Sequence, residues 1–145
     1  MSSPLFQRGR AKAYRPLPPE RRREILAEGL AAYDRGDFFL AHELLEPAWM
    51  GASDPAERDL YQGLIKLAAA FVHEARGNPT GVTKNLAGAR ERLADAIEAG
   101  REAGLAVPQV LLEIDRCLAH GPATGVAIAR LPRGGDLAGS TSGDD

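Results

Sequence analysis

Between residues 42 and 73, side chains of five chemical kinds recur at helical spacing within strongly apolar sequence. They are an indole, a guanidinium, an amide, a carboxylate and two imidazoles, contributed by Trp49, Arg58, Gln62, Glu46, His42 and His73. Polar groups beside apolar helices must find partners or stay in contact with water. We therefore take these six residues as the candidate site, and three interpretations of them follow.

The first interpretation is a structural network between two neighbouring helices. A step of about 100° per residue puts His42 and Glu46 on one edge of their helix. It puts Arg58, Gln62 and His73 on one flank of the next. If a short link makes the two helices antiparallel, Glu46 comes level with Arg58, and His42 with Gln62. An Arg58–Glu46 ion pair and a His42–Gln62 hydrogen bond would then fix how the helices pack.

The second interpretation is a metal site for hydrolysis. His-Glu-Leu-Leu-Glu, residues 42–46, is similar to the zinc-protease pattern His-Glu-x-x-His, with Glu46 in place of the second His. A pair four residues apart on a helix can chelate one divalent ion, such as zinc, that activates water. Catalytic zinc needs three protein ligands, and His73 lies eleven residues beyond Gln62, which is roughly 16 Å along a helix.

The third interpretation is a binding pocket. Trp49, Tyr61 and Phe39 would form a cleft with the polar residues and receive a small molecule or a protein partner. We favour a non-catalytic binding or interaction module without a cofactor. The alternative is a metal-dependent hydrolase that uses His42 and Glu46, so the sequence leaves open whether the protein is an enzyme.

The chain is predicted to form five helices, and the second and third of them carry these residues. Apolar residues recur at helical spacing, and Gly and Pro residues mark where helices start and end. The predicted helices are a first from Pro19, a second after Asp37, a third from Pro55 to Arg76, a fourth from Pro79 and a fifth from Pro108. The third helix has an apolar arc too wide for a surface helix, so we expect it at the centre. The predicted fold is all-α, a single-domain bundle of antiparallel helix hairpins around that helix, and strands are not expected.

Several helix ends can be predicted from individual residues. Asp37, Asp54 and Asn78 are suited to cap the second, third and fourth helices. Glu57 stands three residues after Asp54, the spacing of a capping box, in which its side chain would reach back to the cap. Pro47 lies inside the second helix, where its missing N–H predicts a kink or an early end.

The chain of 145 residues is long enough for one core, and it divides into three segments. Residues 1–18 are predicted to be a basic flexible arm, 19–130 the helical domain and 131–145 a disordered tail. The arm is the one segment suited to nucleic acid, because the rest of the chain is acidic. A homo-oligomer is compatible with this composition.

The composition also indicates the cellular compartment in which the protein is expected. The chain has one cysteine, Cys117, so an intramolecular disulfide is excluded and nothing favours an oxidising compartment. No signal peptide is visible, and the most apolar stretch, residues 64–72, is too short for a membrane span and contains Lys66. We expect a cytoplasmic protein with no membrane association.

The combination of these motifs resembles a known family. The residues that carry the resemblance are Gly36-Asp37-Phe38, Ala41-His42-Glu43, Leu45-Glu46, Trp49, Gln62-Gly63-Leu64-Ile65, Leu67 to Ala70, His73 and Arg76-Gly77-Asn78. Together they resemble the small prokaryotic family known as domain of unknown function 309, over roughly Tyr33 to Leu93. The resemblance implies an all-helical bundle of about five helices and, in some catalogues, a predicted metal-dependent hydrolase. Two residues depart from the usual pattern of the family, Lys66 where Gln is common and Pro47 inside the second helix.

Overall fold

The computed structural model describes residues 5–7, 10–12, 15–101 and 104–120 of the chain. These residues form five helices and one two-stranded antiparallel hairpin. The bounds are β1 Leu5–Gln7, β2 Arg10–Lys12, α1 Pro19–Asp34, α2 Phe38–Gly51, α3 Pro55–Ala75, α4 Pro79–Glu98 and α5 Val107–His120. The predicted all-α, single-domain bundle of about five helices is confirmed.

The predicted caps of three helices are confirmed, and they explain where those helices begin. The side chains of Asp37, Asp54 and Asn78 each accept a hydrogen bond from the backbone N–H three residues later, at 3.3, 3.0 and 3.1 Å respectively. Each bond satisfies one of the backbone donors that a helix leaves unpaired at its start. The chain therefore turns into α2, α3 and α4 at positions set by local sequence.

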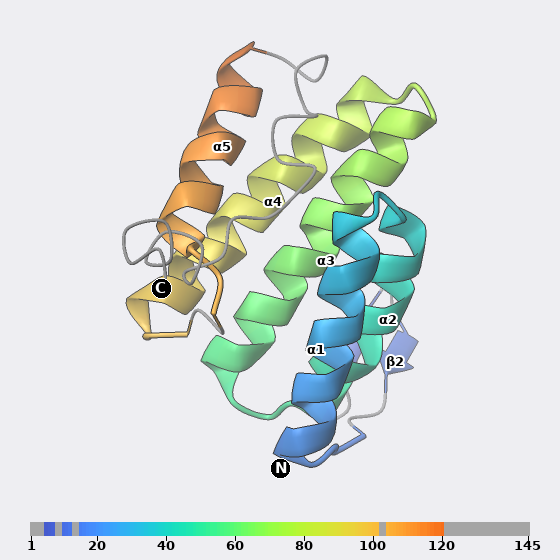
Figure 1. Cartoon of the computed structure of the whole chain (residues 1–145), viewed down its shortest axis with the longest axis vertical. Coiled ribbons are helices and arrows are strands. Elements are labelled where there is room, and N and C mark those ends of the chain that lie inside the picture. The colour runs from blue at the N-terminus through green and yellow to red at the C-terminus, as the bar shows by residue number, and fades with distance from the viewer. Residues whose placement is uncertain (1–4, 8–9, 13–14, 102–103, 121–145) are drawn as a thin grey trace, which may run out of the picture.

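Each helix packs against the next one along the chain, and α3 lies in the middle of the bundle (Figure 1). The main contacts of α3 are with α2 on one side and α4 on the other, while α1 packs on α2 and α5 packs on α4. Leu64 and Leu67 of α3 are almost completely buried. The prediction of a central third helix is therefore confirmed.

Aromatic side chains join three of the helices near one end. The ring of Phe38 at the start of α2 stacks on Phe71 of α3, with the ring centroids 4.9 Å apart. Tyr33 of α1 meets Phe38 edge-on at 5.0 Å. Such pairs bury large apolar surfaces in a specific geometry, so they fix the position of α2 against α3.

The structure differs from the sequence-based expectations in two places. Helix α2 continues through Pro47 to Gly51, so the early end expected at this proline is wrong. Strands β1 and β2 lie in the predicted arm and have three residues each, too few to show an alternating pattern in the sequence. The predicted tail, residues 131–145, lies outside the described residues, as do residues 121–130.

None of the helices in the described segments combines sufficient length with sufficient apolar character to cross a bilayer.

Candidate functional site

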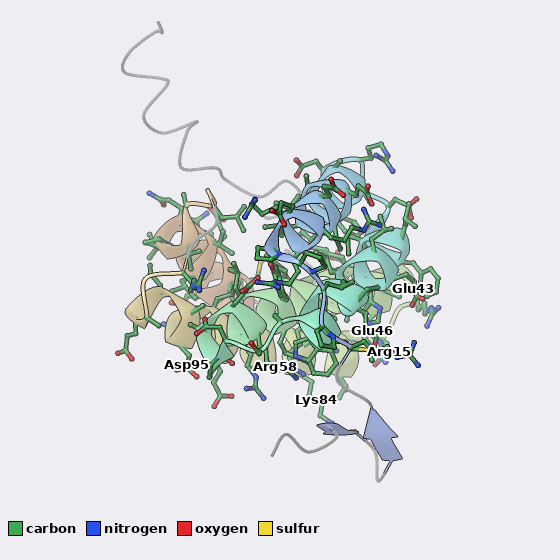
Figure 2. All side chains as sticks on the ribbon, turned by 90° about the horizontal axis from the view of Figure 1, so that it is seen from below. Arg15, Glu43, Glu46, Arg58, Lys84 and Asp95 are labelled. Carbon is green, nitrogen blue, oxygen red and sulfur yellow. The ribbon has the colours of Figure 1, made fainter. Side chains whose placement is uncertain are left out.

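The six candidate residues come from two helices and are all partly exposed. His42, Glu46 and Trp49 lie on α2, and Arg58, Gln62 and His73 on α3. Figure 2 shows Glu46 and Arg58 projecting along the same edge of the bundle. Partial exposure is typical of side chains that line a depression in the surface, where they meet both protein and solvent.

Five of the six residues line one depression of about 290 Å³ between α2, α3 and α4. We call it the imidazole hollow; its polar and aromatic lining is His42, Glu46, Trp49, Gln62, Lys66, His73 and Asn85. Gln62 and His73, which helical periodicity places on one flank of α3, both line this hollow, whereas Arg58 of the same flank does not.

The sixth residue, Arg58, lines a second depression of about 310 Å³. We call this one the guanidinium hollow; its lining is Trp49, Pro55, Arg58, Asp59, Gln62 and Arg92. Trp49 and Gln62 belong to both linings, so the two hollows adjoin. We call the two hollows together the groove; it lies along α2, α3 and α4.

Arg58 is held in place by the end of α2. Its Nη1 donates hydrogen bonds to the carbonyl oxygens of Trp49, at 2.9 Å, and Ala52, at 3.1 Å. Its guanidinium also lies over the Trp49 ring, with Cζ 4.9 Å from the ring centroid. Carbonyls at the end of a helix lack partners within the helix, and a cation over an indole face is attracted by the ring. The Arg58–Glu46 ion pair stays a prediction, whereas the predicted His42–Gln62 hydrogen bond is wrong, because Gln62 makes no side-chain hydrogen bond to a described residue.

His73 is fixed in one orientation and one tautomer. The Oδ1 atom of Asn78 accepts the N–H of Gly81 at 3.1 Å, so the Nδ2 atom of Asn78 faces His73 Nδ1, also at 3.1 Å. Because an amide nitrogen only donates, Nδ1 accepts and the neutral ring carries its hydrogen on Nε2. His73 therefore offers an N–H donor at the wall of the imidazole hollow.

The predicted metal pair, His42 and Glu46, lies on one wall of the imidazole hollow. His42 Nδ1 is 3.4 Å from Glu43 Oε2, without hydrogen-bond geometry. Across the described residues, no three His, Cys, Asp or Glu side chains are grouped closely enough to hold a metal ion. A catalytic zinc site needs three protein ligands, so these residues do not fit one, and we derive no metal-dependent step from them.

Two aromatic residues that were expected in the cleft line neither hollow. Phe39 points away from the groove into solvent and is 58% exposed. Tyr61 is buried on another face of α3, where its hydroxyl donates to Glu57 at 2.6 Å. Both expectations are corrected. Tyr61 is one position from Gln62 and so turns to a different face of α3, and Phe39 lies in the first turn of α2, before the residues that line the hollows.

A second polar cluster, formed by Arg22, Glu57 and Tyr61, was not predicted from the sequence. Both carboxylate oxygens of Glu57 accept hydrogen bonds from Arg22, at 2.7 and 3.1 Å. The Glu57 side chain therefore binds across to α1, and the second half of the expected capping box is wrong. These three residues line a separate depression of about 470 Å³.

This cluster shifts the acidity of its members. Burial acts to raise the pKa of Glu57, but the hydrogen bonds from Arg22 and Tyr61 outweigh it and hold the pKa below its ordinary value. Burial, together with the hydrogen bond to Glu57, raises the pKa of Tyr61 well above the ordinary value. Glu57 therefore stays ionised and Tyr61 stays neutral near pH 7, as expected for a structural link rather than an acid–base pair.

Comparison with known proteins agrees with the family resemblance. Residues 26–85 match the model of the family described as domain of unknown function (DUF309). An uncharacterized protein of Aquifex aeolicus (strain VF5) is 37% identical over 78 residues, which cover 52% of this chain and 23% of the relative. The chain thus spans about a quarter of the length of that relative. The matched family segment contains the six candidate residues.

Proposed function

We propose that this protein is a small-molecule-binding module whose ligand occupies the groove formed by the imidazole and guanidinium hollows. One observation carries the proposal: all six residues selected from the sequence border two adjoining hollows that share Trp49 and Gln62. The two volumes, about 310 and 290 Å³, are those of sites for small molecules.

The lining of the groove supports binding. Gln62 lines both hollows and makes no side-chain hydrogen bond to any described residue, so its amide is left to bind a ligand. Trp49 adds a large apolar surface beside these polar groups. A few polar groups that converge around an apolar surface are typical of a site that orients a ligand.

Trp49 is the single tryptophan of the chain, so its fluorescence reports directly on the groove. The test is a titration of the purified protein with a panel of anionic, cationic and neutral small molecules, followed by Trp49 emission and by the melting temperature. We expect at least one class to give a saturable change in emission and to raise the melting temperature.

A matched pair of variants locates the site. Gln62→Ala is expected to weaken binding about tenfold, because it removes the amide shared by both hollows. Gln109→Ala changes an exposed glutamine of α5 outside the groove and is expected to leave binding unchanged. The proposal fails if no class of ligand binds, or if the two variants bind equally well.

A further inference from the structure

We infer that the ligand of the groove carries a small oxyanion, a carboxylate or a phosphate, bound in the imidazole hollow by Lys66 and His73. This inference rests on the proposed function and names the chemical class of the ligand. Lys66 is the residue on which it mainly depends.

The Lys66 side chain lies against α4. It lies over Gly88, so closely that a Cβ atom added at Gly88 would be 2.8 Å from Lys66 Cδ and 3.6 Å from Nζ. The absence of a side chain at Gly88 thus makes room for the Lys66 stem between α3 and α4. The stem is packed against the protein, and the ammonium group is left at the wall of the hollow.

The charge of Lys66 is not neutralised by any residue that the structure describes. Across the described ranges, Lys66 forms no ion pair, and the side chain is only partly exposed. A partly buried ammonium without a counter-ion attracts an anion more strongly than an exposed one does, because water screens it less. The lining also includes the carboxylate of Glu46, and no ion pair joins it to Lys66, so the ammonium remains available to an anion.

His73 supplies a directed donor in the same hollow. Its ring is fixed by Asn78 and packs on Gly81, where an added Cβ would be 2.6 Å from the ring. The Nε2–H group donates hydrogen bonds to oxygen atoms and repels cations. An oxyanion accepts bonds from both an ammonium and an imidazole N–H, whereas a cation accepts neither.

The two hollows together have three cationic side chains, Lys66, Arg58 and Arg92, and two carboxylates, Glu46 and Asp59. One of the cations is paired, because Arg92 Nη1 lies 3.3 Å from Asp59 Oδ1. The groove therefore has a net charge of 3 − 2 = +1, whereas the whole chain has a net charge of −2. A positive groove on an acidic protein selects anions.

A hydrogen-bond acceptor in the hollow, Asn85, favours an oxyanion that also carries a hydroxyl group. Asn85 donates its Nδ2 hydrogen to the carbonyl oxygen of Gly81 at 2.8 Å, so its own Oδ1 is left to accept a bond from a ligand. A carboxylate that also bears a hydroxyl group satisfies Asn85, Lys66 and His73 together. We therefore use lactate and inorganic phosphate as the two anionic probes, which separate the carboxylate source from the phosphate source.

The experiment follows Trp49 emission at constant ionic strength during titration with lactate, inorganic phosphate and uncharged lactamide. We expect lactate or phosphate to give a saturable change and lactamide to give none. Lys66→Gln is expected to raise the Kd for the bound anion about tenfold or more, because a charge-assisted hydrogen bond is lost.

Lys84→Gln is the matched control. Lys84 is an exposed lysine of α4 (Figure 2) that does not line the hollow, so the variant removes the same charge without touching the site. We expect it to change the Kd by less than about twofold. Circular dichroism of both variants establishes that they are folded.

The inference is overturned if the groove binds neutral or cationic molecules but neither anion, an outcome in which the proposed function still holds. It is also overturned if the two lysine variants weaken anion binding equally. If no molecule of any class binds, the proposed function itself fails.

Discussion

Arg22 of α1 binds Glu57 of α3 through two parallel hydrogen bonds, Nε to Oε2 at 2.7 Å and Nη2 to Oε1 at 3.1 Å. The two side chains are 16% and 12% exposed, and Tyr61 donates a third bond to the same carboxylate. Helix α1 otherwise packs mainly on α2. This buried ion pair is therefore a direct link between the first helix and the central one.

Removing the charge of Glu57 is expected to destabilise the protein. In Glu57→Gln, the Arg22 guanidinium stays buried without a counter-charge, which we expect to lower the free energy of unfolding by roughly 3 kcal/mol. Urea unfolding followed by circular dichroism measures the loss. Asp115→Asn is the matched control, because Asp115 pairs with Arg90 in the same two-bond geometry but both side chains are 45% exposed. Equal losses in the two variants would contradict a special role for the buried pair.

The same ion pair makes stability depend on acid pH. The pKa of Glu57 is lower in the folded state than its ordinary value of 4.5, so in acid the unfolded state binds more protons. The stabilisation is therefore complete above the unfolded-state pKa and is lost as the pH falls through the folded-state pKa. We expect the stability difference between the wild type and Glu57→Gln to shrink as the pH is lowered from about 6 to about 3. A difference that stays constant over this range, measured by urea unfolding at each pH, would refute the link to Glu57.

The fold could be predicted from sequence because its helix ends are set locally. Asp54 and Pro55 are neighbours, and a cap with a proline in the first turn starts α3 regardless of the rest of the chain. The partner of Glu57 could not be predicted in this way. Arg22 is 35 residues away, and the local capping-box pattern gave Glu57 a different role.

The sequence allowed us to predict which residues share one flank of a helix. Contacts between residues of different helices were harder to predict. Periodicity placed Gln62 and His73 on one flank of α3, and both line the imidazole hollow. The carbonyl partners of Arg58 were missed because they depend on where α2 ends. Pro47 suggested an early end, whereas α2 reaches Gly51 and presents the Trp49 and Ala52 carbonyls to Arg58.

Close packing at Gly81 predicts different effects for two glycine substitutions in α4. In Gly81→Ala, the new Cβ would be 2.6 Å from the ring of His73 and 2.8 Å from Asn78 Nδ2. Both groups are hydrogen-bonded to each other, so we expect a loss of roughly 1–3 kcal/mol in the free energy of unfolding. Thermal or urea unfolding measures it.

Gly88→Ala is the control, because its Cβ would meet the flexible stem of Lys66 at 2.8 Å. That stem can move, and alanine favours a helix over glycine by about 1 kcal/mol. We expect Gly88→Ala to be neutral or stabilising. Similar destabilisation in the two variants would show that the His73–Asn78 contact does not hold this part of α4.

Metal removal tests the remaining interpretation of His42 and Glu46. Because no third ligand stands beside them among the described residues, and two ligands from one helix do not complete a catalytic zinc site, we expect EDTA to leave the melting temperature and ligand binding unchanged. Metal analysis of tag-free protein should then find no zinc, manganese or iron whose content depends on His42. Near-stoichiometric metal in the wild type, lost in His42→Ala but retained in the exposed-histidine control His120→Ala, would instead favour the hydrolase. A melting temperature that falls with EDTA and recovers with zinc would favour it as well.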